Sequence, residues 1–233
     1  MEITYLRWDS DFFQLKIGSI MLQEDTSIVD IMHQGRIQGF DLLYGFQESD
    51  QNITNIPLQF KPYYQTTNVL YSKKLQNGVN VTYDAAIREA QYPEDLAKLH
   101  ALSIQAGHSS RFKLDLKFGY EKFKALYEIW LSNSIQKLIA DHVFLHHHDD
   151  IEGFVTIKTN DHSATIGLIA VDGQFRNKNI GGKLIGAAEI FANNAQCSVL
   201  EVGTQVENEG ACRFYEKNGF SPIHFNKIFH FWL

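Results

Sequence analysis

The first 80 residues alternate short apolar runs with polar breaks. Between the apolar runs at 17–23 and 40–47, Ile28, Ile31 and Met32 recur at helical spacing, and Gly39 follows where a helix would end. We therefore predict a helix over 27–38, and a strand at about 67–75. The polar break at 76–80 predicts a boundary between an N-terminal α/β domain, residues 1–79, and a second domain, residues 80–233.

The second domain has a different pattern, in which strands and helices follow one another in the order β, α, α, β, β, β, α, β, α, β. This order predicts a mixed α/β domain with a central sheet flanked by helices. The segment 108–119 is polar, aromatic and irregular. The predicted strands are 85–89, 137–147, 152–159, 164–171, 198–206 and 224–233. One predicted helix begins near Pro93, a second covers 120–135, a third follows the turn at 176–181, and a fourth covers 209–217.

Composition narrows the class of protein. The chain is 44% hydrophobic, enough for a sizeable core, and carries a formal net charge of −6, which argues against a nucleic-acid partner. We expect no secretory leader and no membrane span, because no basic start precedes an apolar run and no window approaches about 18 apolar residues. The cysteines, Cys197 and Cys212, suit a reducing compartment, so we predict a cytoplasmic protein.

A glycine-containing turn between a predicted strand and a predicted helix, at 170–194, is the strongest candidate for chemistry. The chain does not match the Walker A pattern, because Leu184 rather than Ser or Thr follows Gly182-Lys183. The glycines do not match the spacing of a dinucleotide-binding motif either. The pattern [QR]-x-x-G-x-[GA] fits from Arg176 to Gly181, with Asn179 at the first glycine position. Asn is the residue after glycine that best tolerates φ > 0, so we expect a left-handed backbone there and an anion at the helix N-terminus.

A second motif lies about 30 residues further on, N-x-x-A-x-x-[FL]-Y-x-x-x-G-F. The chain matches it with Asn208, Ala211, Phe214, Tyr215, Gly219 and Phe220. Together the two motifs resemble the acyl-CoA-binding core of the GNAT acetyltransferases. The resemblance implies a GNAT fold over 80–233 and acyl-CoA, acetyl or longer, as co-substrate.

Three further segments narrow the resemblance: WDSDFFQLKIGSI at 8–20, SRF at 110–112, and the closing FHFWL. They are similar to the dTDP-fucosamine acetyltransferase family, which acylates the amine of a dTDP-linked amino-dideoxy sugar. The resemblance implies a dTDP-amino-sugar substrate and an N-terminal domain that contributes to the sugar-nucleotide site. It identifies neither the position of the amine nor the acyl group.

The resemblance also assigns roles. Tyr215 would act as the general acid that protonates the departing thiolate, and backbone N–H groups near the end of the 164–171 strand would stabilise the oxyanion. The residues expected to contact coenzyme A are Ile169, Ala170, Val171, Arg176, Asn177, Lys178, Asn179, Ile180, Gly181, Gly182, Lys183 and Asn208.

On the acceptor side, Ser110 and Arg111 are candidates to hold the diphosphate, because Arg presents a planar fork to phosphate oxygens. Phe112 or Tyr120 would stack on thymine, and His108 completes the expected substrate-binding set.

No general base stands out. The candidates are His108, Asp115, Asp84 and Glu201. An amine with a pKa of about 8 costs only about 1.4 kcal/mol to neutralise at pH 7, against about 4.6 kcal/mol for a lysine. A sugar amine therefore makes a modest demand on the base.

The histidines at 146–148 raise the question of a metal. Adjacent strand residues alternate faces, so at most His146 and His148 share one face, and no matching acidic or Cys cluster is evident. We expect no metal.

Two other functions remain open: acetylation of a protein or polyamine amine, and non-catalytic binding of acyl-CoA. The aromatic closing strand could pair at a subunit interface, which would make the protein a homodimer.

Overall fold

The computed structural model describes residues 2–48, 56–76, 82–93 and 95–233. The strands are β1 (Thr4–Tyr5), β2 (Ile17–Met21), β3 (Leu42–Glu48), β4 (Tyr64–Lys74), β5 (Ile87–Glu89), β6 (His142–His147), β7 (Ile151–Thr159), β8 (Ser163–Val171), β9 (Val199–Gln205) and β10 (Ser221–Trp232). The α-helices are α1 (Arg7–Phe13), α2 (Ile28–Ile37), α3 (Leu96–Ala106), α4 (Arg111–Leu114), α5 (Tyr120–Ile135), α6 (Ile180–Asn194) and α7 (Glu209–Lys217), and short 3-10 turns cover Leu58–Phe60 and Gly173–Phe175.

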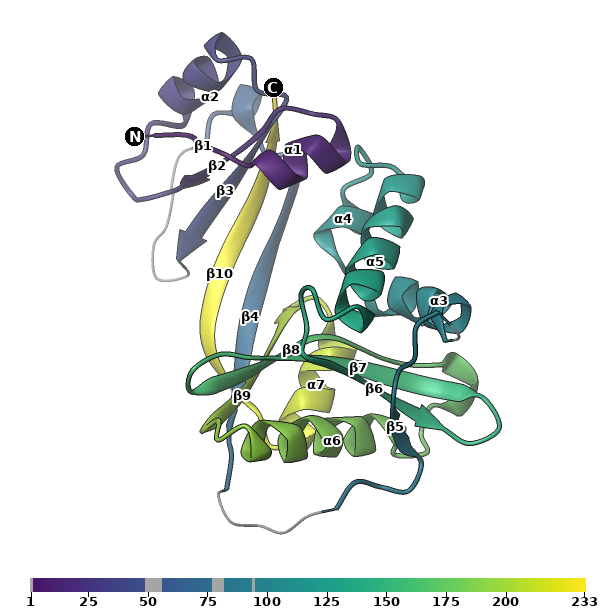
Figure 1. Ribbon diagram of the computed structural model, residues 1–233. Helices are drawn as coiled ribbons and strands as arrows, with labels where there is room; N and C mark the ends of the chain where they lie inside the picture. Colours follow the sequence, from purple (N-terminus) through teal and green to yellow (C-terminus); the bar gives the residue numbers. More distant parts are fainter. Residues whose placement is uncertain (1, 49–55, 77–81, 94) are drawn as a thin grey trace.

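The strands form one ten-stranded sheet in the order β1-β2-β3-β10-β4-β9-β8-β7-β6-β5. The pairs β2–β3 and β8–β9 are parallel and the others antiparallel. β4, from the first third of the chain, lies between β10 and β9, so the sheet runs without a break from the N-terminal elements into the C-terminal ones (Figure 1). The predicted boundary at 79/80 lies outside the described residues, and the division into two domains stays a prediction.

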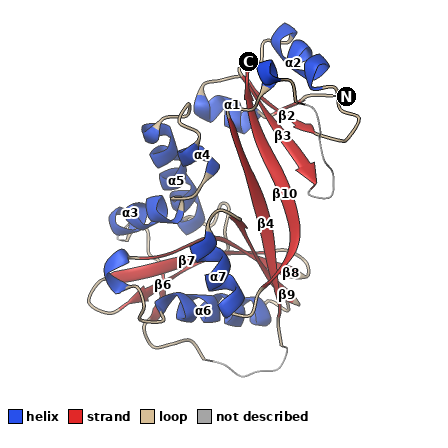
Figure 2. Ribbon diagram, turned by 180° about the vertical axis from the view of Figure 1, so that it is seen from behind, coloured by secondary structure: helices blue, strands red, loops and turns tan. Residues whose placement is uncertain are grey.

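Helices cover the sheet on both sides, and α6 lies across β6–β9 from α3 and α5 (Figure 1, and from behind in Figure 2). One cluster joins α6 and Tyr215 of α7 to Val69, Ile166 and Val202 on the sheet. We call this side the α6 face. Other clusters join α3 and α5 to Leu168 and Ala170, and α1, α4 and α5 to Tyr44 and Phe46. We call this side the α5 face.

Most predicted elements are confirmed. The helices at 120–135 and 209–217 and the helix after the glycine turn are present, and Ser27 caps α2 by accepting a hydrogen bond from the Asp30 N–H. The strand predicted from 137 begins only at His142, because Lys137 has a φ of 61° and ends the preceding helix. The helix expected near Pro93 begins at Leu96, and the segment called irregular contains α4.

The closing strand differs from its predicted role. β10 is hydrogen bonded to β3 on one side and to β4 on the other. It therefore has no free edge over the paired residues, and strand pairing between subunits through it is excluded. Assembly as a homodimer stays a prediction, but strand pairing through β10 no longer supports it.

The sheet opens at one point, between β8 and β9. These parallel strands pair from Ser163–Val199 to Ile166–Val202 and no further. A bulge in β8 coincides with the end of pairing: Gly167 and Leu168 stand opposite Thr156 alone, and the Thr156 Oγ1 accepts a hydrogen bond from the Leu168 N–H at 2.8 Å. Beyond this point, which we call the fork, the β9-side edge of β8 pairs with no strand in the part of the chain that the structure describes.

None of the helices in the described ranges combines the length and the apolar character needed to cross a bilayer.

Candidate active site

The turn before α6 has the backbone that its sequence predicts. Asn179 is left-handed, with φ 58° and ψ 17°, and Asn177 has a φ of 64°. The prediction for Asn179 is confirmed. The first N–H groups of α6 follow directly, and unsatisfied N–H groups at a helix N-terminus attract anions.

The two glycines of the turn serve packing rather than an unusual φ. Neither has a positive φ in the described chain. A Cβ on Gly181 would lie 2.8 Å from the Phe214 ring of α7, and one on Gly182 would lie 2.5 Å from the Asn179 Oδ1. The asparagines therefore supply the left-handed conformation, and the glycines let α7 and the Asn179 side chain approach.

The cations of the turn fall into two groups. Lys183 forms an ion pair with Asp84 at 3.1 Å. Arg176 and Lys178 are exposed and form no ion pair with any residue that the structure describes, although the Lys178 Nζ lies 5.0 Å from the centre of the Phe175 ring. Two free cations beside a helix N-terminus suit the pyrophosphate of a coenzyme A molecule.

The second motif holds α7 in place. The Asn208 Oδ1 accepts from the Ala211 N–H at 3.3 Å, and its Nδ2 lies 3.4 Å from the Thr204 Oγ1. Both polar ends of this side chain are thus used in capping the helix. The sequence placed Asn208 among the cofactor contacts, and the structure gives its side chain a capping role.

Tyr215 lies on the α6 face and is 5% exposed, with its ring against Tyr71, Phe214 and Phe220. Its hydroxyl makes no hydrogen bond to another residue of the described ranges. Burial raises the pKa of the phenol, so it keeps its proton at neutral pH. A buried, protonated hydroxyl without a partner is a suitable proton donor.

The end of β8 lies beside the fork. Ile169 and Val171 pack on the α6 face, whereas Ala170 packs on the α5 face. A Cβ on Gly153 of β7 would lie 2.7 Å from the Ala170 carbonyl oxygen, so a glycine there permits the close pairing of β7 with this part of β8.

Arg111 is the central charge of the α5 face. Its guanidinium lies 4.1 Å from the centre of the Tyr44 ring and 4.4 Å from that of Phe112, and its Nη1 lies 3.1 Å from the His230 Nε2. Burial lowers the pKa of this group, but an arginine stays charged. In the part of the chain that the structure describes, no carboxylate lies within ion-pair distance of Arg111.

His230 and Asp115 hold Arg111. Because arginine only donates, the His230 Nε2 must accept, and the Nδ1–H must donate to the Asp115 Oδ2 at 2.6 Å. Burial lowers the pKa of His230, which agrees with a neutral ring. Burial raises the pKa of Asp115, but hydrogen bonds from His230 and Trp232 outweigh it, and the net shift is downward. Sequence reasoning missed His230, although it lies in the FHFWL segment that carried the resemblance.

Of the other predicted acceptor residues, Phe112 contacts the Arg111 guanidinium through its ring, and no contact of His108 or Tyr120 with Arg111 is found among the described residues. Ser110 caps α4 by accepting from the Phe112 N–H at 3.2 Å. Phe112 is 7% exposed, and its ring stacks on Phe13 and contacts Phe118 and Trp130 in the core. Tyr120 and His108 are exposed, on the first turn of α5 and after α3.

Polar side chains cross the α5 face in register. Gln205 pairs with Asn68 and Asn68 with Asn226, so their side chains share this face and form what we call the amide row. Tyr64, His230 and Tyr44 form a second row, the ring row, at the level of Arg111. Between the two rows, the Thr66 hydroxyl donates to the Glu207 Oε2 at 2.8 Å.

Of the candidate bases, only Glu201 lies at the fork. It pairs with Thr165 of β8, one residue before the last pair, and shares the α5 face with Gly203 and Gln205. Asp84 is bound to Lys183, and Asp115 is bound to His230 and Trp232. A Cβ on Gly203 would meet nothing within 4 Å, so there is open space beside the fork on this face.

The histidine run has a partner that the sequence hid. The His146 Nδ1 lies 2.7 Å from the Glu152 Oε2 across the β6–β7 hairpin, and a ligand atom of His148 lies within 4.8 Å of both. Both His146 and Glu152 are buried, and the His146 Nε2 has no hydrogen-bond partner among the described residues. The Nδ1 and Glu152 form a buried hydrogen-bonded pair, and the expected absence of a metal stays a prediction.

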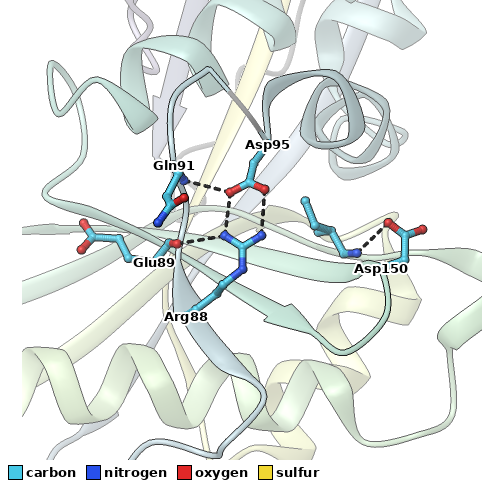
Figure 3. Close-up of polar contacts among 6 residues, drawn as sticks. Arg88, Glu89, Gln91, Asp95 and Asp150 are labelled. Atoms are coloured by element: carbon cyan, nitrogen blue, oxygen red, sulfur yellow. Dashed lines mark hydrogen bonds and ion pairs between the residues drawn. The ribbon is translucent and has the colours of Figure 1, made fainter.

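Ion pairs also fix the edge of the sheet next to α3. Arg88 of β5 forms a bidentate pair with Asp95, and the Asp95 carboxylate accepts from the Gln91 N–H (Figure 3). The hydrogen bond from Arg88 lowers the pKa of Asp95. Asp150, also drawn there, pairs with Lys98 at 2.9 Å. All these charges are matched, so they stabilise the edge and leave no free group for chemistry.

Comparison with known proteins identifies the class. Residues 114–220 match the model of the Acetyltransferase (GNAT) family, so this part of the chain is a GNAT acetyltransferase domain. The spore coat polysaccharide biosynthesis protein SpsD of Bacillus subtilis (strain 168) is 22% identical over 140 residues, which cover 60% of this chain. The chain spans about half the length, 48%, of that curated relative.

Solved structures share the fold over most of the chain. A functionally unknown conserved protein from Staphylococcus epidermidis superimposes with a TM-score of 0.63 at 14% identity, over 93% of this chain and 83% of its own. A putative GNAT acetyltransferase from Novosphingobium aromaticivorans gives 0.54 at 12% identity, over 82% and 73%. At identities this low, the superpositions show a shared fold and nothing more. Together with the family match, they confirm the predicted GNAT architecture.

Proposed function

We propose that the protein transfers an acyl group from acyl-CoA to the amine of a dTDP-linked amino-dideoxyhexose, in the synthesis of a surface polysaccharide. The observation that carries the proposal is the fork, because it opens the sheet between the face that carries the turn before α6 and the face that carries Arg111, whose guanidinium has no ion pair among the described residues. The polysaccharide role of SpsD supports the substrate class.

In the proposed mechanism, the α6 turn holds the coenzyme A pyrophosphate through its N–H groups, Arg176 and Lys178. Backbone N–H groups at Ile169 to Val171 stabilise the negative charge that develops on the acyl oxygen. Tyr215 donates its proton to the departing thiolate. The amine attacks directly within a ternary complex, so no cysteine nucleophile is needed, and Glu201 is placed to accept the proton of the amine.

The sugar amine matches what the site offers. The half-buried carboxylate of Glu201 suffices as a base for an amine with a pKa of about 8, which costs about 1.4 kcal/mol to neutralise at pH 7. A cationic polyamine would instead meet Arg111 at the far end of the acceptor face, and that contact is repulsive.

The test is release of free thiol from acetyl-CoA and from longer acyl-CoAs. The acceptors are a panel of dTDP-amino sugars, with spermidine and an N-terminal peptide as rival acceptors. We expect thiol release with at least one dTDP-amino sugar and none with the rivals. Release with spermidine or the peptide alone would replace the proposed acceptor, and tight CoA binding with no release from any acceptor would indicate a non-catalytic acyl-CoA-binding protein. A cytoplasmic location and assembly as a homodimer stay predictions from the sequence.

A further inference from the structure

The amide row and Arg111 lie at opposite ends of one strip of the α5 face, and the row in register between them holds Thr66, Ile228 and Phe46. Asn68 of the amide row and Tyr64 of the ring row are four residues apart on β4, which corresponds to about 13 Å of strand. Arg111 contacts His230, the register partner of Tyr64. The strip is therefore longer than a single sugar ring, and its two ends differ in chemistry.

We propose that the acceptor lies along this strip in one direction. The amine-bearing sugar would contact the amide row, next to the fork, and a phosphate group of the acceptor would contact Arg111. The inference rests on the proposed function and adds the residues and the direction of the acceptor to it. It makes Gln205 and Asn68 specificity-determining residues, and His230 and Asp115 positioning residues for Arg111.

The fork end has space and neutral hydrogen-bonding groups. Gln205 lies three residues beyond Val202, the last β9 residue paired with β8, and Gly203 between them faces open space. The Gln205 Nε2 lies 3.5 Å from the Asn68 Oδ1, and the buried Asn226 Oδ1 at the end of the row has no hydrogen-bond partner within the described ranges. Amides both donate and accept, so such a row can bind the hydroxyl groups of a sugar.

The Arg111 end is prepared for an anion. Of the five N–H donors of the guanidinium, the one hydrogen bond found in the described structure uses Nη1, toward His230. The rings of Tyr44 and Phe112 and the His230–Asp115 pair fix the plane of the group. The fixed guanidinium of Arg111, with Asp9 nearby but no carboxylate at ion-pair distance in the described structure, loses little entropy when it binds a phosphate in bidentate fashion.

The first experiment measures binding of dTDP, which carries the phosphates but no amine, by calorimetry. The variants are Arg111→Gln and, as a matched control, Arg213→Gln, which removes an exposed arginine on α7. We expect dTDP to bind the wild type and Arg213→Gln equally and Arg111→Gln at least tenfold more weakly, with CoA binding unchanged in all three. Equal dTDP affinity for the wild type and Arg111→Gln would overturn the inference.

The second experiment tests the fork end through the pH profile of kcat, measured at saturating dTDP-amino sugar, because kcat reports the pKa values of the enzyme–substrate complex. Gln205→Glu adds a carboxylate beside the proposed amine, which would favour the ammonium form. We expect the acidic limb of the profile to move to higher pH by about one unit, since a nearby opposite charge shifts pKa values by that order. Gln196→Glu, an exposed site after α6, serves as the control and should leave the profile unchanged. An unchanged profile in Gln205→Glu would remove the amide row from the site.

The outcomes separate the inference from the proposed function. Thiol release with a dTDP-amino sugar but Arg111-independent binding of dTDP would keep the function and refute the direction of the acceptor. Arg111-dependent binding of dTDP without thiol release from any dTDP-amino sugar would support Arg111 as the phosphate contact and refute the proposed function. The role of the amide row in binding the amine-bearing sugar would then be refuted as well.

Discussion

The two faces of the sheet are built from different kinds of sequence information. On the α6 face, the turn at 176–181 and the helix that follows it are contiguous, and the α7 motif lies about 30 residues away. On the α5 face, Tyr44, Tyr64, Arg111, Asp115 and His230 come from β3, β4, the α4 segment and β10. The first face is specified by local motifs, and the second by the register of strands far apart in the chain. The fork is where the two meet.

The largest effect that separates the faces is expected from Tyr215→Phe. The ring would still fill its place against Tyr71 and Phe220, but the proton donor would be lost. A general acid contributes about 10²–10⁴-fold, so we expect kcat to fall by at least about 100-fold, with the KM for the acceptor nearly unchanged. Steady-state thiol release at saturating acyl-CoA measures this.

The matched control is Tyr71→Phe, which removes the neighbouring hydroxyl that donates to the Glu216 Oε1 at 3.0 Å. Turnover of Tyr71→Phe should stay within a few-fold of the wild type. Near-wild-type turnover in Tyr215→Phe would take this residue out of the mechanism and leave the α6 face with binding alone.

The next effect concerns the strands that carry the fork. In Gly153→Ala, the new Cβ would lie 2.7 Å from the Ala170 carbonyl oxygen and 3.1 Å from the Leu184 Cδ1, so β7 and β8 would have to separate. Overpacking of this kind costs about 1–3 kcal/mol, which urea unfolding would measure. Gly186→Ala on α6 has nothing within 4 Å of the new Cβ and should be neutral or slightly stabilising. Equal stability of the two variants would show that β8 has freedom to move at the fork.

The sequence predicts the α6 face well for a physical reason. Helix periodicity, a cap and a left-handed asparagine act within a few residues, so Asn179, Ile180 and the helix at 180–194 can be recognised without the fold. The sequence also names Arg111, but it cannot place His230 beside it, because that contact depends on the pairing of β10 with β3 and β4. For the same reason it could not show that Phe112, a candidate to stack on thymine, has three aromatic neighbours around its ring. Glu152 beside His146 was missed because the hairpin, not the spacing, brings them together.

The α5 face also predicts a pH dependence of stability. Burial holds the folded-state pKa of His230 below 6.5, so its contribution is complete above about pH 6.5 and is lost as the pH falls toward the folded-state pKa. Each unit of depression corresponds to about 1.4 kcal/mol. The lowered pKa of Asp115 acts in a separate window, below about pH 3.9. The charged and titratable groups around the ring are Arg111, Tyr44, Tyr64 and Asp115.

His230→Gln tests this dependence, since glutamine can accept from Arg111 and donate to Asp115 without titrating. We expect the loss of unfolding free energy between pH 6.5 and 5 to be smaller in His230→Gln than in the wild type. His224→Gln, an exposed position on the same strand, should follow the wild type. Parallel curves for all three proteins would mean that the histidine is not held neutral.

The smallest effect returns to the α6 face and concerns the conformation of one residue. Asn179 has a φ of 58°, a region in which alanine is strained by about 1 kcal/mol and glycine is not. Asn179→Ala should therefore lower the free energy of unfolding by about 0.5–1 kcal/mol and weaken CoA binding, whereas Asn179→Gly should stay close to the wild type in both. Asn194→Ala, at the other end of α6, shares the chemical change without a positive φ and should have little effect. If Asn179→Ala and Asn179→Gly weaken CoA binding equally, the asparagine side chain, rather than its left-handed backbone, holds the ligand.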